Sequence, residues 1–391
     1  MRRIYMDANA TTPLLPDVLA AMQPYWIEHF ANASSIHQPG QEARRGVDHA
    51  REQVAEFLGC RAAEVVFNSG GTEGDNTALR GLLRAGDHFI TTAIEHSAIL
   101  TTTAHLERVG VAVTRVAPLP DGRIDPEAIR SALRPDTRLI SVMMANNETG
   151  VVQDVGAIGR VASEAGVVLH IDAVQAAGKV PIRVEEIGCQ LLSISAHKMY
   201  GPKGVGALFV RRGTQIESLV LGGGHERRRR AGTENVPGIV GFGQAAEIAQ
   251  KTLADGALDR LAALRDRLES GLLARIPGCG VNGNDANGGT VARVANTTNI
   301  RFDAVDSEAL VIALDLKGLS VSGGSACHSG ATEPSHVLLA MGVDKARARA
   351  SLRFSLLKTA TDDDVDTVLE IVPAAVERLR ALTPAFAGAG A

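Results

Sequence analysis

The chain has 391 residues, which is too long for one small hydrophobic core and leaves room for roughly two domains of about 150 residues each. Hydrophobic residues make up 45% and charged residues 21%, a balance typical of globular proteins that excludes long-range disorder. The net charge of -4 and the aromatic content of 3% argue against a basic nucleic-acid surface and against base stacking.

The compartment can be predicted from what the first residues and the cysteines lack. The N-terminus has no apolar run of about 7–15 residues like that of a secretory signal, and no stretch approaches the roughly 20 apolar residues of a membrane-spanning helix. No C-x-x-C pair occurs, so we expect neither a disulfide framework nor a metal site. We therefore expect a cytoplasmic protein without a membrane or nucleic-acid partner.

Seven short apolar runs predict the strands of one sheet. Helical patterns lie between many of them, for example Ala43–Leu58 before Gly59 and Asp154–Ala165 before Gly166. Apolar strands that alternate with helices predict a parallel sheet covered on both faces. The seven expected strands are Glu64–Phe67, His88–Ala93, Gly110–Val116, Arg138–Ala145, Val167–Asp172, Leu191–Ser195 and Val205–Val210.

Beyond about residue 236 the pattern changes to two helices, Gly238–Lys251 and Ala257–Arg275, followed by further strands and a Gly/Ser-rich loop at Ser320–Gly330. We expect a smaller α+β domain in this part of the chain. The expected division is an N-terminal segment at 1–15 that packs on the small domain, a large cofactor-binding domain at 16–255, and the small domain at 256–391.

Polar residues follow five of the expected strands, at the sheet edge where ligands bind in open parallel sheets. Each has an ordinary interpretation as a turn, a helix cap or a solvated loop residue. Together they offer a helix start for a phosphate, a carboxylate for a ring nitrogen, a flat imidazole and an amine for a Schiff base, which pyridoxal 5′-phosphate (PLP) requires. The residues are Gly70-Gly71-Thr72, His96, Asn146-Asn147, Asp172 with Gln175, and His197-Lys198.

Several longer motifs resemble the cysteine desulfurases of the NifS/IscS type, which are fold-type I PLP-dependent enzymes of aminotransferase class V. The resemblance covers almost the whole chain and implies an α/β fold with a mixed, mostly parallel seven-stranded sheet in the large domain. The motifs that carry it include Tyr5–Thr12, Asn146–Gly150, Ser193–Pro202, Gly222–Glu226, Arg230–Asn235, Gly324–Cys327 and Arg353–Leu356.

The resemblance also implies a role for each residue at the expected sheet edge. Lys198 binds the PLP aldehyde and moves the substrate proton, Asp172 pairs with the ring nitrogen, and Gln175 contacts the ring hydroxyl. His96 stacks on the ring and belongs to the catalytic set, and Arg353 orients the substrate carboxylate. The remaining expected contacts are Gly71, Thr72, Ser195 and His197 at the phosphate, Asn147 at cofactor and substrate, and Thr233 at the phosphate of the other subunit of a homodimer.

Cys327 differs from the other cysteines in its surroundings. Cys60, Cys189 and Cys279 lie beside apolar strands or a turn and are interpreted as small buried residues, whereas Cys327 lies in a polar Gly/Ser-rich stretch from which a thiol can approach a site. By the resemblance, free cysteine is converted to alanine and the sulfur becomes a persulfide on Cys327. The expected acceptor is a protein or thiol that serves iron–sulfur cluster or thio-cofactor assembly.

Two departures from the family pattern leave alternatives open. His328 stands where many of these enzymes have Thr, and the Ala-Cys-His-Ser sequence around it is similar to selenocysteine lyases, so selenocysteine lyase or another PLP-dependent C–S lyase is the alternative activity. Leu357-Lys358 replaces a usual Gly-Arg after the Arg353 motif.

The run Arg227–Arg230 is either a solvated charge cluster or a group that faces the partner's phosphate.

The sequence disfavours two functions of other classes. A PLP-binding scaffold that only relays sulfur is disfavoured because Lys198, Asp172, Arg353 and Cys327 are all retained. An NAD-binding Rossmann domain is excluded because no G-x-G-x-x-G opens a strand–helix unit.

Overall fold

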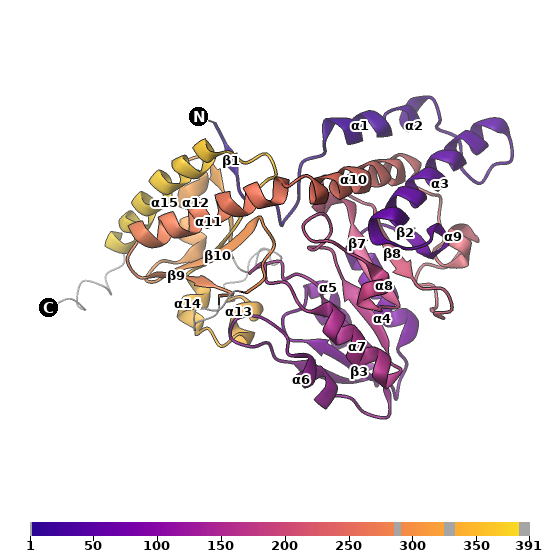
Figure 1. Ribbon diagram of the computed structural model, residues 1–391, viewed down its shortest axis with the longest axis horizontal. Helices are drawn as coiled ribbons and strands as arrows, with labels where there is room; N and C mark the ends of the chain where they lie inside the picture. The colour runs from indigo at the N-terminus through magenta and orange to yellow at the C-terminus, as the bar shows by residue number, and fades with distance from the viewer. Residues whose placement is uncertain (1, 285–290, 324–332, 383–391) are drawn as a thin grey trace.

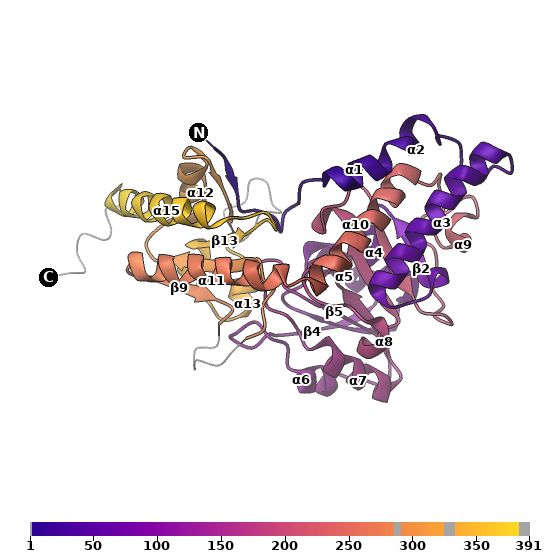
Figure 2. The same ribbon diagram turned by 45° about the horizontal axis from the view of Figure 1, so that its top comes forward.

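The computed structural model describes residues 2–284, 291–323 and 333–382. Figures 1 and 2 show a larger body that contains the main sheet and a smaller body built from the C-terminal part of the chain. Helices α10 (Val236–Ala254) and α11 (Ala257–Arg275) follow each other across the junction between the two bodies. Within the described residues, no helix combines the length and the apolar character needed to cross a membrane.

The main sheet has seven strands in the order β2-β8-β7-β6-β5-β3-β4. β8 is antiparallel to both of its neighbours and the other pairs are parallel, so the expected mixed, mostly parallel sheet is confirmed. All seven strands form within two residues of the expected bounds. These are β2 (Val65–Asn68), β3 (His88–Thr92), β4 (Ala112–Val116), β5 (Thr137–Met143), β6 (Val168–Asp172), β7 (Leu191–Ser195) and β8 (Gly206–Val210).

Helices cover both faces of this sheet because its strands are apolar on both sides. Leu139 of β5 packs in the core with α4 (Gly71–Leu82) and α5 (Ser97–Arg108), whereas Ile140 packs in the core on the opposite face. Successive residues of a strand point to opposite faces, so a strand buried on both sides cannot alternate with polar residues. The helices of the opposite face are α3 (Gln38–Leu58), α7 (Val155–Ala165) and α10.

The helix ends fit the expected stops better than the expected starts. Gly59 and Gly166 end α3 and α7 with φ values of +69° and +66°, the left-handed conformation that glycine adopts without strain. The expected start of α3 at Ala43 is wrong by five residues. The helix begins at Gln38, because the His37 side chain accepts a hydrogen bond from Gly40 N and caps it.

The smaller body contains a four-stranded antiparallel sheet in the order β12-β13-β10-β9. Its core also includes Ile4 and Met6, because β1 (Ile4–Tyr5) pairs with β11 (Leu319–Ser320) in this part of the molecule. The division at residues 255 and 256 remains a prediction. The elements are β9 (Cys279–Asn282), β10 (Thr297–Phe302), β12 (Ser322–Gly323), β13 (Ser351–Ser355), α11, α12 (Ser307–Asp315) and α15 (Asp362–Leu382).

Shorter helices complete the fold. Two of them, α13 (His336–Ala340) and α14 (Lys345–Arg349), lie in sequence between β12 and β13 of the smaller body. Val337 and Ala348 from these helices nevertheless pack in the core of the larger body. The short helices are α1 (Pro16–Met22), α2 (Pro24–Ile27), α6 (Pro126–Ser131), α8 (Val184–Ile187), α9 (His225–Arg228), α13 (His336–Ala340) and α14 (Lys345–Arg349).

Candidate active site

A cavity of about 190 Å³ lies at the ends of strands β5, β6 and β7, where the sequence places the polar residues. It collects nearly every residue expected at the cofactor from segments that are far apart in the chain. The expected residues in its wall are Gly71, Thr72, His96, Asn147, Asp172, Gln175, Ser195, His197 and Lys198.

One wall of the cavity is the start of α4, where two glycines allow a close approach. Gly70 has a φ of +144°, which disfavours other residues, and a Cβ on Gly71 would lie 2.5 Å from the Val174 side chain. The first backbone N–H groups of a helix have no partner within the helix and attract anions. This end of α4, with the Thr72 hydroxyl, is therefore suited to a phosphate group.

Asp172 ends β6 and supplies the buried carboxylate of the cavity. Its Oδ1 accepts a hydrogen bond of 2.9 Å from Val174 N, and its side chain is buried. Burial raises the pKa of Asp172, while the Val174 hydrogen bond and the charges of His96 and Lys198 oppose that rise. A protonated ring nitrogen in the cavity would supply the counter-charge that this carboxylate needs.

Lys198 follows β7 in a short turn, and its amine lies at the N-terminal segment. Nζ donates hydrogen bonds to the backbone oxygens of Asn9 and Ala10, at 2.5 and 2.8 Å. His197 Nδ1 lies 3.1 Å from Thr11 Oγ1 in the same segment. Burial, with the charges of Lys198 and Lys203, lowers the pKa of His197 to about 4, so its ring is neutral near pH 7.

His96 caps α5, since its Nδ1 accepts a hydrogen bond of 3.1 Å from Ala98 N. Burial lowers the pKa of His96, and the charges of Lys198 and His336 lower it further against the opposing effect of Asp172. A ring with a lowered pKa is held more readily in its neutral form, which is suited to contact with another flat ring.

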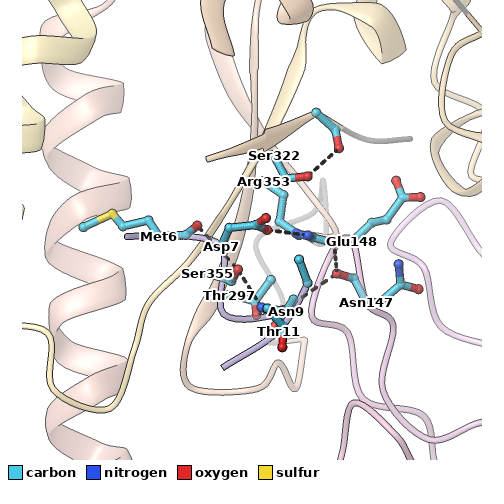
Figure 3. Close-up of polar contacts among 12 residues, drawn as sticks. Met6, Asp7, Asn9, Thr11, Asn147, Glu148, Thr297, Ser322, Arg353 and Ser355 are labelled. Atoms are coloured by element: carbon cyan, nitrogen blue, oxygen red, sulfur yellow. Dashed lines mark hydrogen bonds and ion pairs between the residues drawn. The ribbon is translucent and has the colours of Figure 1, made fainter. Parts of the chain in front are cut away.

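Arg353 of β13 is buried beside the cavity wall and holds the N-terminal segment. It donates hydrogen bonds to Asp7 Oδ1 at 2.7 Å and to the backbone oxygen of Asn147 at 3.0 Å (Figure 3). Its buried Nε has no hydrogen-bond partner among the described residues. This arrangement leaves the guanidinium able to bind a carboxylate next to Asn147.

Some expected site residues are not in the cavity. Thr233 is exposed and absent from the wall, and Cys327 and His328 lie outside the described residues. Arg230 pairs with Glu73 in the first turn of α4 at 2.9 Å, so one member of the arginine run is held near the expected phosphate position. Lys358 N donates to Tyr200 Oη at 2.6 Å.

The sequence alone indicates no role for four residues that lie at or behind the cavity, namely Asp7, Asn9, Asp75 and Lys179. Asp75 lines it, is buried, and has a pKa raised well above its usual range by burial and by repulsion from Asp172. Its position three residues after Thr72 on one helix could have indicated this. The contacts of Asp7, Asn9 and Lys179 had no such local signal.

The three described cysteines have little thiolate character. Burial raises the pKa of Cys60 and of Cys189 to about 12, and it raises the pKa of Cys279 as well. Since the thiolate is the reactive form, none of these three is suited to nucleophilic attack near pH 7.

Comparisons with known proteins agree with the geometry. The aminotransferase class-V family matches residues 4–368. The chain is 46% identical over 387 residues to a cysteine desulfurase of Nostoc sp., which covers 98% of this chain and 95% of the relative. The structure of a NifS-like protein superposes with a TM-score of 0.89 at 36% identity, covering 96% of this chain and all of that one. SspA in complex with cysteine gives a TM-score of 0.79 at 33% identity, covering 90% and 98%.

Proposed function

We propose that the cavity described above binds PLP and takes L-cysteine as its substrate. The premise is that the chain belongs to the aminotransferase class-V family and, within it, to the cysteine desulfurases. The observation that supports this most is the meeting of Lys198, Asp172, His96 and the start of α4 in one cavity wall. An amine, a buried carboxylate, a neutral ring and an anion-binding helix end are the groups this cofactor needs.

PLP, when bound, supplies an aldehyde for an amine and a ring that accepts the electrons released when a bond at Cα breaks. Lys198 holds the cofactor through Nζ and, once released from it, takes the Cα proton of the substrate and later returns a proton. The Asp172 carboxylate would keep the ring nitrogen protonated, and the Gln175 amide would donate to the ring oxygen. His96 would stack on the ring.

The phosphate is held by neutral donors and by the helix end. We assign this role to Gly71, Thr72, Ser195 and His197, with the partner subunit's Thr233 completing the site. Arg353 and Asn147 orient the substrate carboxylate, since the Arg353 guanidinium lies against Asn147 and its Nε has no partner among the described residues.

Sulfur transfer is assigned to Cys327 on the basis of the sequence. The Cys327 thiolate attacks the substrate sulfur and the Cβ–S bond breaks, leaving its electron pair on the carbon skeleton, which takes up a proton and leaves as alanine. The sulfur remains on Cys327 as a persulfide and passes to an acceptor for iron–sulfur cluster or thio-cofactor assembly. The raised pKa of the other three cysteines supports this choice.

A homodimer is part of the proposal, and we place its action in the cytoplasm. Large apolar side chains near the N-terminus are exposed in the single chain, with Phe30 at 75% and Ile36 at 93%. A group of large exposed apolar side chains is more typical of a protein–protein interface than of a surface that faces water. An interface there would also account for Thr233, which is exposed in the single chain.

An absorbance spectrum of the purified protein tests the cofactor, and an alanine-release assay with L-cysteine and L-selenocysteine tests the substrate. We expect visible absorbance from bound PLP and release of alanine from L-cysteine. A protein that takes up no PLP on addition would overturn the proposal, and alanine release from selenocysteine alone would favour the selenocysteine lyase alternative.

A further inference from the structure

Lys179 lies behind the cavity wall and is hydrogen-bonded to Gln175, which lines the cavity. It lies in the turn after β6 that also contains Gln175, and it is partly buried. Its Nζ donates hydrogen bonds to Gln175 Oε1 at 2.7 Å and to Asn9 Oδ1 at 2.8 Å. Burial lowers the pKa of Lys179 well below its usual value, and repulsion by Lys198 and Arg353 adds to this. The two amide oxygens are the acceptors that satisfy the N–H groups of this amine.

The contacts of Gln175 fix which end of its amide faces which neighbour. Gln175 Oε1 faces the Lys179 amine, and Nε2 donates a hydrogen bond of 2.9 Å to the backbone oxygen of Asn9. The opposite orientation would place Oε1 against the Asn9 carbonyl oxygen and would point the amide hydrogens at an amine that donates. The Lys179 amine and the Asn9 carbonyl oxygen therefore favour the same orientation of the Gln175 amide.

This orientation determines what Gln175 can offer to the cavity that it lines. Nε2 carries two hydrogens, and the Asn9 carbonyl takes one of them, so the other is the donor available to a group in the cavity. A hydrogen bond from Lys179 to the amide oxygen polarises the amide and strengthens its N–H groups as donors. Lys179 thus affects both the direction and the strength of the hydrogen bond that Gln175 Nε2 can donate into the cavity.

We infer that Lys179 is a positioning residue that holds and polarises the Gln175 amide so that it donates a hydrogen bond to the ring oxygen of the cofactor. The inference rests on the proposed function, because the cavity must bind PLP for that acceptor to be present. Lys179 itself does not line this cavity.

The test is the pH titration of the visible absorbance of the PLP-loaded protein, which reports protonation of the nitrogen that joins Lys198 to the cofactor. A donor at the ring oxygen withdraws negative charge that would otherwise help to hold this proton. Lys179→Met should therefore raise the midpoint of the titration by roughly 0.5 to 1 pH unit, the equivalent of about one hydrogen bond. Lys251→Met, which changes an exposed lysine of α10, should leave the midpoint unchanged.

The Gln175→Ala variant shows whether Lys179 changes the titration midpoint through the Gln175 amide or directly through its own charge. Gln175→Ala alone should raise the midpoint, and adding Lys179→Met to it should produce no further change. An equal shift by Lys179→Met in both backgrounds would overturn the inference, as would no shift in the otherwise wild-type protein. If Lys179→Met does not fold, Lys179→Gln keeps an N–H donor and should give a smaller shift in the same direction; no shift would count against the inference.

Thermal unfolding of the same variants without PLP measures the purely structural part of the effect. A lysine that only stabilises the turn would lower the melting temperature without moving the midpoint of the absorbance titration, and that result would also overturn the inference. If the wild-type protein did not bind PLP, the proposed function itself would be wrong. That outcome is recognised by the absence of visible absorbance after PLP is added to the wild-type protein.

Discussion

Arg353 and Asp7 form a partly buried ion pair in which Nη2 lies 2.7 Å from Oδ1 although the residues are 346 positions apart in the chain. The same guanidinium donates to the backbone oxygen of Asn147 in the cavity wall (Figure 3). The N-terminal segment therefore determines the direction of the arginine that we assign to the substrate carboxylate.

Asp7→Ala should weaken the binding of L-cysteine more than it slows the chemical step. Without the carboxylate the guanidinium loses one charge-assisted hydrogen bond and turns away from its position beside Asn147. We expect KM for L-cysteine to rise by about tenfold or more, with a smaller change in kcat and an unchanged PLP spectrum. Asp315→Ala, which removes an exposed ion pair with Arg3, is the control. An unchanged KM in Asp7→Ala would show that Asp7 does not position Arg353.

Lys198→Ala should remove both turnover and the visible absorbance of covalently held PLP, because no other assigned residue supplies an amine in the cavity wall. Lys203→Ala is a matched control, since Lys203 is five residues away and exposed. The measurement is the absorbance spectrum before and after addition of PLP, with alanine release as the second readout. Turnover that persists in Lys198→Ala would mean that another amine carries the cofactor.

The sheet could be predicted from the sequence because its strands are apolar runs buried on both faces, and such runs are visible without knowing their neighbours. Leu139 and Ile140 illustrate this, since they pack in different cores although they are adjacent. The cavity residues can also be predicted, because each lies at the end of a predicted strand or within a few residues after it. The start of α3 was not found, since a His37 cap gives a weaker signal than a glycine stop.

The residues behind the cavity could not be predicted because their contacts join distant segments. Lys179 and Asn9 are 170 positions apart, and nothing in the turn around Lys179 indicates that an amide oxygen of the N-terminal segment will meet it. Buried polar side chains must find hydrogen-bond partners, but the sequence does not say which ones. For Lys179 and Asn9, the partners are determined by the packing of the N-terminal segment against both bodies.

Glu95→Gln should make the stability of the protein without PLP less dependent on pH. Burial raises the pKa of Glu95 from 4.5 to about 8, so the folded chain binds this proton more tightly than the unfolded chain. In the wild type this contribution is fully present below about pH 4.5 and is lost as the pH rises through about 8. The free energy of unfolding should therefore fall less between pH 5 and pH 9 in Glu95→Gln, as denaturant titrations can measure. Glu164→Gln on the surface is the control, and a wild-type slope in Glu95→Gln would contradict the shifted pKa.

Light scattering should give a mass of twice 41.0 kDa for the wild type if the exposed apolar residues form an interface between two copies. Charged residues at those positions would be buried without partners, so Ile27→Asp with Phe30→Asp should shift the protein toward the monomer and weaken its retention of PLP. Leu316→Asp changes a side chain of the smaller body that is equally exposed, at 81%, and should leave the mass unchanged. A monomeric wild type with full activity would exclude the shared site.

Cys327→Ala should separate the desulfurase from a simple lyase. A C–S bond needs nucleophilic help at sulfur, whereas a C–Se bond is weaker and selenol leaves more readily, so selenocysteine can be cleaved without a protein thiol. We expect Cys327→Ala to bind L-cysteine and change the PLP spectrum, yet to release little alanine and form no persulfide, while it keeps much of any activity toward selenocysteine. Cys279→Ala is the control, because burial raises the pKa of that thiol and it has no role in the proposed reaction. If Cys327→Ala turned over L-cysteine at the wild-type rate, sulfur would leave without attack by Cys327 and the persulfide assignment would be wrong.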